Sequence, residues 1–172
     1  MKPLKEYSLW LEPSGDEFKK INKVLSKLQK ETKSVGFKPH VTLLGGLYYK
    51  EDSLKEMLSV FKKNRRFRIY LKKMSSGNNE FKTIFIECQK SKELLNLNRL
   101  SQKIFKTKKP FKPHMSIVYG DFNKENKKNI KGRIESLGVN YFSFEVRSIS
   151  LWKAFGTADK WKRLKRVNLQ PN

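Results

Sequence analysis

The sequence predicts an α+β fold built from two similar lobes that face each other across a cleft. A ten-residue segment at 37–46 is repeated at 111–120, and half of its positions are identical. The repeat recurs at about half the length of the 172-residue chain. Strand-like and helix-like patterns alternate around it, and no linker or low-complexity segment divides the chain. We therefore expect one domain over residues 1–172, with the two repeated segments as central strands.

Hydrophobic periodicity assigns the elements of the first half in order. Apolar residues alternate over 6–12, which predicts a strand. Ser14 and Glu17 then form a capping-box pattern, and an amphipathic helix follows to about residue 33. The first repeated segment is the next strand, and apolar residues at helical spacing over 54–61 predict a second, shorter helix.

The second half continues the same alternation. Strands are expected at 67–74 and 81–88, with a turn at 76–79 between them. A helix from Ser91 and the second repeated strand follow. The chain then forms a helix that ends at Gly138 and two strands at 141–153 and 161–169. The last two strands are joined around Gly156. Each half of the chain thus supplies strands and helices around one copy of the repeat.

The only two histidines of the chain occupy the same position in the two repeated segments. A hydroxyl residue follows each by two positions: Thr42 after His40, and Ser116 after His114. Because side chains alternate faces along a strand, each histidine and its hydroxyl should point the same way, into the cleft. The proline before each histidine suits the first residue of a strand, where no ladder N–H is needed. A lone strand histidine is most often structural, but a motif repeated around both histidines favours a shared site.

These motifs resemble the signature of the two-histidine phosphoesterase superfamily, which has the RNA ligase-like phosphodiesterase fold. Their flanks are most similar to the plant- and yeast-type cyclic phosphodiesterases, in which F-x-P-H-V-T and P-H-[LM]-S-[LI]-[LV]-Y recur. Residues 7–10 and 151–153 and the later Trp161 also resemble that group, so the similarity covers nearly the whole chain. The resemblance implies two pseudo-symmetric lobes, each an antiparallel sheet with outer helices, and an active-site cleft between them.

Two imidazoles that face one cleft suit a reaction in which two protons move. Histidine titrates near pH 6.5, so near neutrality one ring can be neutral while the other is protonated. Hydrolysis of a cyclic phosphate needs a base for the proton of water and an acid for the leaving alkoxide. Hydroxyl groups can donate hydrogen bonds to the non-bridging oxygens as charge gathers there. The expected catalytic residues are His40, His114, Thr42 and Ser116, and the sequence does not say which histidine is the acid.

Other catalytic arrangements find less support. Asp121 is the only carboxylate close to either motif and has no counterpart at the first, which argues against a Ser-His-Asp triad. Zinc usually takes three or four protein ligands, and two distant histidines with one cysteine supply too few. Neither a Walker A motif nor a dinucleotide fingerprint is present. The sequence therefore predicts metal-independent chemistry without a cofactor.

Aromatic residues near the motifs are candidates for binding a nucleoside. Tyr119 matches the tyrosine of the resembling family, but strand alternation places it opposite the motif hydroxyl, so a twist or bulge is needed to aim it at the cleft. Trp10 and Phe81 could stack on a base. Core packing is an alternative of at least equal weight for all three, and Trp152 and Trp161 are assigned to the core.

The formal net charge of +23 fits attraction to a polyanion such as RNA. It fits coding bias in an AT-rich genome equally well, because the excess is mainly lysine spread over every segment. Lys153 could screen a phosphate, although one residue among 39 basic ones carries little weight. A single cysteine fits a reducing compartment, and neither a signal peptide nor a membrane span is evident. We expect a monomer in the cytoplasm or nucleus, without a membrane partner.

The expected function is metal-independent hydrolysis of 2',3'-cyclic phosphates. The substrate would be a cyclic nucleotide or the cyclic phosphate end of an RNA. The family resemblance implies opening to a 2'-phosphate, or opening of ADP-ribose 1'',2''-cyclic phosphate. Two alternatives remain: the same chemistry on 2',5'-oligoadenylates or cyclic oligonucleotide signals, and a non-enzymatic RNA-binding module.

Overall fold

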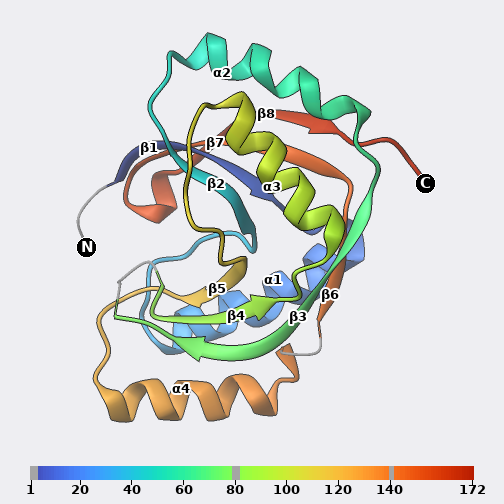
Figure 1. The fold of residues 1–172 in the computed structure, drawn as a ribbon. Helices are drawn as coiled ribbons and strands as arrows, with labels where there is room; N and C mark the ends of the chain where they lie inside the picture. The colour runs from blue at the N-terminus through green and yellow to red at the C-terminus, as the bar shows by residue number, and fades with distance from the viewer. Residues whose placement is uncertain (1–3, 79–81, 140–141) are drawn as a thin grey trace.

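The computed structural model describes residues 4–78, 82–139 and 142–172, which form an α+β fold (Figure 1). The strands are β1 Leu4–Leu11, β2 Val41–Leu47, β3 Phe67–Ser76, β4 Ile84–Cys88, β5 His114–Val118, β6 Ser143–Val146, β7 Ser148–Gly156 and β8 Lys162–Asn168. The α-helices are α1 Gly15–Glu31, α2 Glu51–Met57, α3 Lys92–Ile104 and α4 Lys124–Ser136. Short 3₁₀ helices lie at Leu58–Lys63 and Ala158–Lys160.

The strands form one antiparallel sheet with the two motif strands at its centre. Its order is β6-β3-β4-β5-β2-β1-β7-β8, so β5 and β2 each end a four-stranded half. The halves are joined by one pair of residues, Val41 opposite Met115. These residues are equivalent in the repeat, and equivalent residues that face each other on antiparallel strands define a local two-fold axis. The predicted arrangement of two related halves with central motif strands is confirmed.

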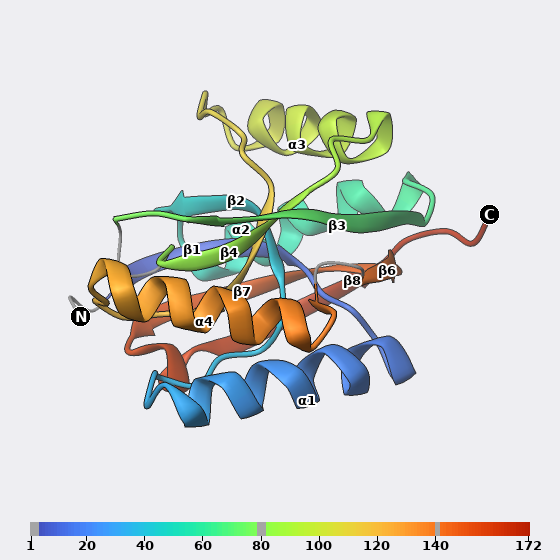
Figure 2. The same ribbon diagram turned by 90° about the horizontal axis from the view of Figure 1, so that it is seen from below.

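Helices cover the curled sheet on both sides and tie its halves together. Figure 2 shows α1 and α4 on one side and α3 on the other. α1 packs against β5 and α3 packs against β2, so each contacts the motif strand of the opposite half. The Asn98 amide of α3 also donates to the Leu43 carbonyl over 2.8 Å. The buried apolar residues therefore form a continuous core under both halves.

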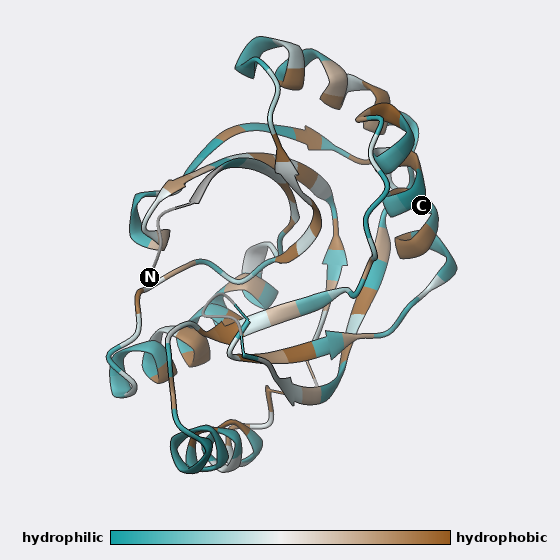
Figure 3. Ribbon diagram, turned by 60° about the vertical axis from the view of Figure 1, so that its left-hand side comes forward, coloured by the Kyte–Doolittle hydropathy of each residue, from teal (hydrophilic) through white to brown (hydrophobic). Residues whose placement is uncertain are grey.

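Alternation along the strands selects the residues that enter this core. In β3, Phe67, Ile69 and Leu71 are buried while Arg68 and Tyr70 are exposed. Apolar and polar residues alternate in this way along several strands (Figure 3). No helix in the described part of the chain combines the length and the apolarity that a membrane crossing requires.

The prediction of a single strand at 141–153 is wrong, because the described part of this range forms two strands, β6 and β7. β6 pairs with β3 at the edge of one half, whereas β7 pairs with β1 and β8 in the other. One straight strand cannot occupy both places in a curled sheet. The chain therefore leaves the first half at Arg147 and enters the second. The strand expected at 81–88 begins at Ile84, and residues 79–81 lie outside the described part.

Candidate active site

One pocket of about 290 Å³ receives side chains from both copies of the repeated motif. His40 and Thr42 line it from the β2 side, and His114 and Ser116 line it from β5. Because β2 and β5 meet at the central pair of the sheet, the two histidines flank the local two-fold axis. The structure thus brings together the four residues that the sequence singled out as catalytic.

Strand alternation explains why these side chains reach the pocket. The neighbouring residues Val41 and Leu43 are buried in the core, as are Met115 and Ile117 in the second copy. Side chains at odd and even positions point to opposite faces of a strand. Packing of the apolar neighbours therefore fixes the direction in which each histidine and its hydroxyl point.

Both imidazoles are held by the same backbone hydrogen bond. The Nδ1 atom of His40 lies 2.7 Å from the Lys38 carbonyl oxygen, and that of His114 lies 2.8 Å from the Lys112 carbonyl oxygen. A carbonyl oxygen only accepts, so each Nδ1 carries the hydrogen and each Nε2 is left for proton transfer. In each copy the lysine precedes a proline, which favours an extended backbone there. The repeated Lys-Pro-His sequence thus sets the tautomer of both rings.

His40 is buried and lies flat against an indole ring. Its side chain is 5% exposed, and its ring centroid is 3.5 Å from that of Trp10 at an interplanar angle of 7°. Burial lowers the pKa of His40 to about 4 because the charged ring would lose its hydration, and the nearby His114 lowers it further. The hydrogen bond to the Lys38 carbonyl acts in the opposite direction. His40 is therefore neutral over the physiological pH range.

His114 lies in a more open and more polar environment. Phe85 meets its ring edge-on, with centroids 5.0 Å apart. Burial lowers the pKa of His114, the backbone hydrogen bond raises it, the charge of Lys82 lowers it, and Glu87 raises it. Glu87 lies directly opposite His114 in the pairing of β4 with β5. Two rings that are equivalent in sequence are therefore unequal in their affinity for a proton.

A bulge in β5 accounts for the position of Tyr119. Phe85 pairs with Ser116 but the adjacent Ile84 pairs with Val118, so β5 has one extra residue at Ile117. The bulge reverses the alternation that would have placed Tyr119 opposite the hydroxyl. Tyr119 lines the pocket, and its phenol hydrogen-bonds the Ser116 side chain. Burial raises the pKa of Tyr119, so its hydroxyl stays protonated.

Trp10 lines the pocket, but the proposed stacking on a base needs revision. One face of its indole is covered by His40, and the other is covered by Trp152 at a centroid distance of 4.3 Å. Its Nε1 donates to the Ser8 hydroxyl over 2.9 Å, which fixes the ring in its plane. Trp10 therefore holds the His40 ring in place and has no free face for a base.

The structure describes two of the other three aromatic residues considered in the sequence analysis. Phe81 lies outside the described residues. Trp152 is buried, as predicted for the core. Trp161 is also buried, but it lines the pocket, which the core assignment missed.

Sequence reasoning also missed polar residues in the pocket wall. Glu6 and Ser8 line it together with Trp10, and alternation along β1 could have identified them. Lys82 lines the pocket too, with its ammonium 4.5 Å from the ring centroid of Phe85. No pattern in the sequence marked Lys82 among so many lysines.

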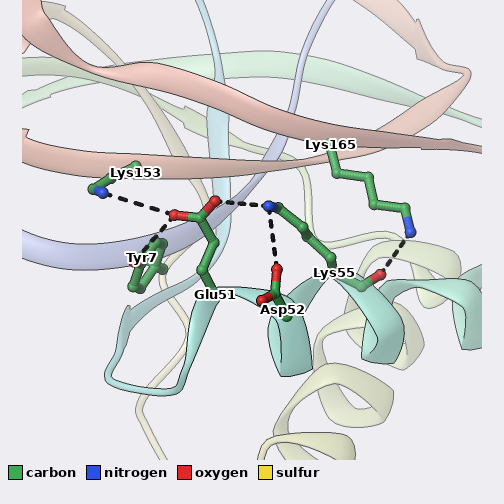
Figure 4. A network of polar contacts seen from close by, with 6 residues as sticks. All are labelled: Tyr7, Glu51, Asp52, Lys55, Lys153 and Lys165. Carbon is green, nitrogen blue, oxygen red and sulfur yellow. Dashed lines mark hydrogen bonds and ion pairs between the residues drawn. The ribbon is translucent and has the colours of Figure 1, made fainter.

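Lys153 does not line the pocket, because alternation places it on the opposite side of β7. Its ammonium lies 3.7 Å from a Glu51 carboxylate oxygen, which also accepts a hydrogen bond from Tyr7 (Figure 4). Glu51 is further paired with Lys55 over 2.7 Å. Lys153 thus belongs to a polar network that joins β7 to α2. Among the described residues, no three His, Cys, Asp or Glu side chains are grouped so as to hold a metal ion.

Comparison with known proteins identifies the family of the chain. The family described as "Cyclic phosphodiesterase-like protein" matches residues 6–169. The chain is 26% identical to the cyclic phosphodiesterase of Arabidopsis thaliana over 174 residues, with 96% of each chain covered.

Two solved structures share the fold at low sequence identity. LigT of E. coli in its apo form aligns with a TM-score of 0.63 at 14% identity and covers 99% of both chains. TT0787 of Thermus thermophilus aligns with a TM-score of 0.62 at 14% identity over 96% of this chain and 98% of its own. These two structures show the fold, and the family match confirms the predicted resemblance to the cyclic phosphodiesterases. The chain belongs to the cyclic phosphodiesterase-like protein family and is a phosphodiesterase.

Proposed function

We propose that this enzyme opens 2',3'-cyclic phosphates of nucleotides or RNA ends to 2'-phosphates, without a metal ion. ADP-ribose 1'',2''-cyclic phosphate is a second substrate of the same chemistry. The observation that carries the proposal is the pair of Nδ1-anchored histidines in one pocket, each with its Nε2 left for proton transfer. Motif hydroxyls in the same pocket supply donors for the phosphate oxygens.

The unequal surroundings of the histidines suggest their roles. Burial lowers the pKa of His40 to about 4, and the less buried His114 has Glu87 as a neighbour that favours its charged form. When the pair holds one proton, that proton therefore resides on His114. We assign His40 as the general base and His114 as the general acid.

The reaction then proceeds with both protons accounted for. Water attacks phosphorus while His40 Nε2 accepts its proton. The bond from phosphorus to the leaving ribose oxygen breaks, and that oxygen takes the proton of His114 Nε2. Thr42 and Ser116 donate to the non-bridging oxygens, where negative charge increases in the transition state. The 2'-phosphate leaves with His40 protonated and His114 neutral, and exchange with solvent restores the pair.

The pKa shifts predict an acid-shifted dependence of kcat/KM on pH. As pH falls toward 4, His40 becomes protonated and loses its function as a base; as pH rises, His114 loses the proton that it must donate. Since both free-enzyme pKa values lie below 6.5, kcat/KM should be greatest below pH 6.5. The kcat profile should lie at higher pH, because a bound phosphate anion stabilises both imidazolium ions. A kcat/KM maximum above pH 7 would contradict the lowered pKa values on which the assignment of base and acid rests.

The decisive experiment is product analysis over a panel of substrates. The panel contains 2',3'-cyclic mononucleotides, RNA with a cyclic end, ADP-ribose 1'',2''-cyclic phosphate, 2',5'-oligoadenylate and cyclic dinucleotides. We expect turnover of the first three, with 2'-phosphates from the ribonucleotides, and activity that persists after extensive chelation. Cleavage confined to 2',5'-oligoadenylate or cyclic dinucleotides would replace the proposed substrate. Activity that is lost on chelation and restored by one divalent ion would replace the mechanism.

A further inference from the structure

Few of the basic side chains of the chain line the catalytic pocket. Of its described lining residues, Lys82 is basic and Glu6 is acidic, besides the two histidines. A second hollow, with a volume of about 1000 Å³, lies along α4 and the end of β3. We call it the lysine groove, and its basic residues are Lys124, Lys127, Lys128 and Lys131.

The four lysines of the groove destabilise α4 by repelling one another. Its four lysines have the i, i+3, i+4, i+7 spacing of one helix face, which places like charges side by side. Such pairs destabilise a helix by a few tenths of a kcal/mol each, and Lys124 lies at the positive end of the helix dipole. The apolar face of α4 buries only Ile130 and Ile134. A bound polyanion would offset this repulsion.

The four lysines form no ion pair within the described part of the chain. Glu125 and Glu135 also line the groove, but no ion pair joins a carboxylate to any of its four lysines there. Lys127 donates to the Gly77 carbonyl over 3.1 Å, a hydrogen bond that leaves its charge in place. The groove lining therefore carries four positive and two negative charges, a net charge of +2, with its four lysines free of ion pairs among the described residues.

Described residues on either side of the β3–β4 turn line the two hollows: Ser76 and Asn78 line the groove, and Lys82 lines the catalytic pocket. Gly77 accepts the hydrogen bond from Lys127 on the groove side and donates its own N–H to the Thr83 carbonyl over 3.1 Å. Thr83 also donates from its hydroxyl to the Gly120 carbonyl, just beyond β5. Lys82, next to Thr83, lines the catalytic pocket. Hydrogen bonds through Gly77 and Thr83 thus connect the groove lysine Lys127 with the pocket side of the hairpin.

We propose that the lysine groove binds the phosphodiester backbone of an RNA whose cyclic phosphate end occupies the catalytic pocket. This inference rests on the proposed function and narrows its substrate class from mononucleotides to RNA ends. The cyclic phosphate terminates the 3' side, so the strand runs in its 5' direction from the pocket past Lys82 to the groove. Lysine suits this role because it contacts phosphate as a point charge without reading the base sequence.

The test compares a cyclic mononucleotide with a short RNA that ends in the same cyclic phosphate. The groove variant changes Lys124, Lys127, Lys128 and Lys131 to Gln. The matched control makes the same charge change on the exposed face of α1, at Lys20, Lys23, Lys27 and Lys30. We expect the groove variant to lower the ratio of kcat/KM for RNA to that for mononucleotide at least about tenfold at 50 mM salt, while the control leaves the ratio within about twofold.

The salt dependence of RNA binding supplies a readout that does not need turnover. For single strands, the log–log slope of affinity against salt is about −0.7 per contacted phosphate. Binding of an RNA with a 3'-phosphate should therefore show a shallower slope in the groove variant, by about 0.7 for each phosphate that is no longer neutralised. If the groove variant is unstable, the double variant of the exposed Lys124 and Lys128 should show a smaller change of the same sign.

Equal loss in the groove variant and the α1 control would show that bulk charge attracts RNA, and the inference would fail. It would also fail if the wild type hydrolysed the mononucleotide and the RNA equally well with the same shallow salt dependence, although the proposed function would stand. Conversely, a groove-dependent salt slope in an enzyme that opens no cyclic phosphate would overturn the proposed function and leave the RNA surface supported.

Discussion

Replacing either His40 or His114 with alanine should lower kcat at least ~10²-fold, the lower end of the range for general acid–base catalysis. Each variant keeps one imidazole and loses one of the two proton transfers. The double variant should lose less than the product of the single losses, because residues that act as a unit are not additive. Steady-state kinetics with a 2',3'-cyclic mononucleotide measures all three. A single variant with near-normal turnover would remove that histidine from the mechanism.

Alanine at position 40 also opens a cavity against Trp10, so a matched variant is needed. His40→Asn can still donate to the Lys38 carbonyl as Nδ1 does, but it has no Nε2. The same replacement at His114 preserves the bond to the Lys112 carbonyl. Both asparagine variants should be as inactive as the alanine variants while unfolding closer to the wild-type temperature. Activity in the asparagine variants would show that the histidines are needed for structure only.

Removing either motif hydroxyl should reduce kcat/KM by roughly 10- to 10³-fold, because a donor to the developing charge is lost. Thr42→Val removes the hydroxyl and keeps the branched shape that packs in β2, whereas Thr42→Ser keeps the hydroxyl and should be mild. Ser116→Ala is the corresponding change in β5. The same damage from Thr42→Ser as from Thr42→Val would show that Thr42 matters through packing.

Ser116 needs one further control because its hydroxyl also bonds the phenol of Tyr119. Tyr119→Phe deletes that bond and leaves the serine hydroxyl in the pocket. We expect its kcat/KM to fall far less than that of Ser116→Ala. Equal losses in the two variants would mean that Ser116 acts by holding Tyr119.

The repeated motif made the centre of the fold predictable. Two copies of one strand pattern placed at half the chain length require related halves, and alternation within each copy separates the pocket residues from the core. The break at Arg147 was not predictable, because both of its flanking strands have buried apolar residues and the break reflects their partners in different halves. The hydrophobic periodicity of a strand does not show which other strand it pairs with in the sheet.

The same distinction applies to the site. His40 and Thr42 were predictable because their chemistry and spacing are local. The Tyr119 side chain reaches the pocket because β5 has one extra residue in its pairing with β4. Trp10 supports the His40 ring through a stacking contact between residues far apart in the sequence. Lys82 is distinguished only by its place in the fold. These features arise from tertiary packing, which the sequence pattern does not encode.

The local two-fold axis through the Val41–Met115 pair has a consequence for which ester bond of a cyclic phosphate is opened. A phosphorus atom on the two-fold axis meets a histidine and a hydroxyl from either direction, so the two histidine–hydroxyl pairs alone give an incoming diester no preferred orientation. Orientation must come from groups that break the symmetry: Trp10 behind one histidine, and Phe85 with Lys82 beside the other. The residues that decide which of the two ester bonds opens therefore lie outside the histidine–hydroxyl pairs that open it.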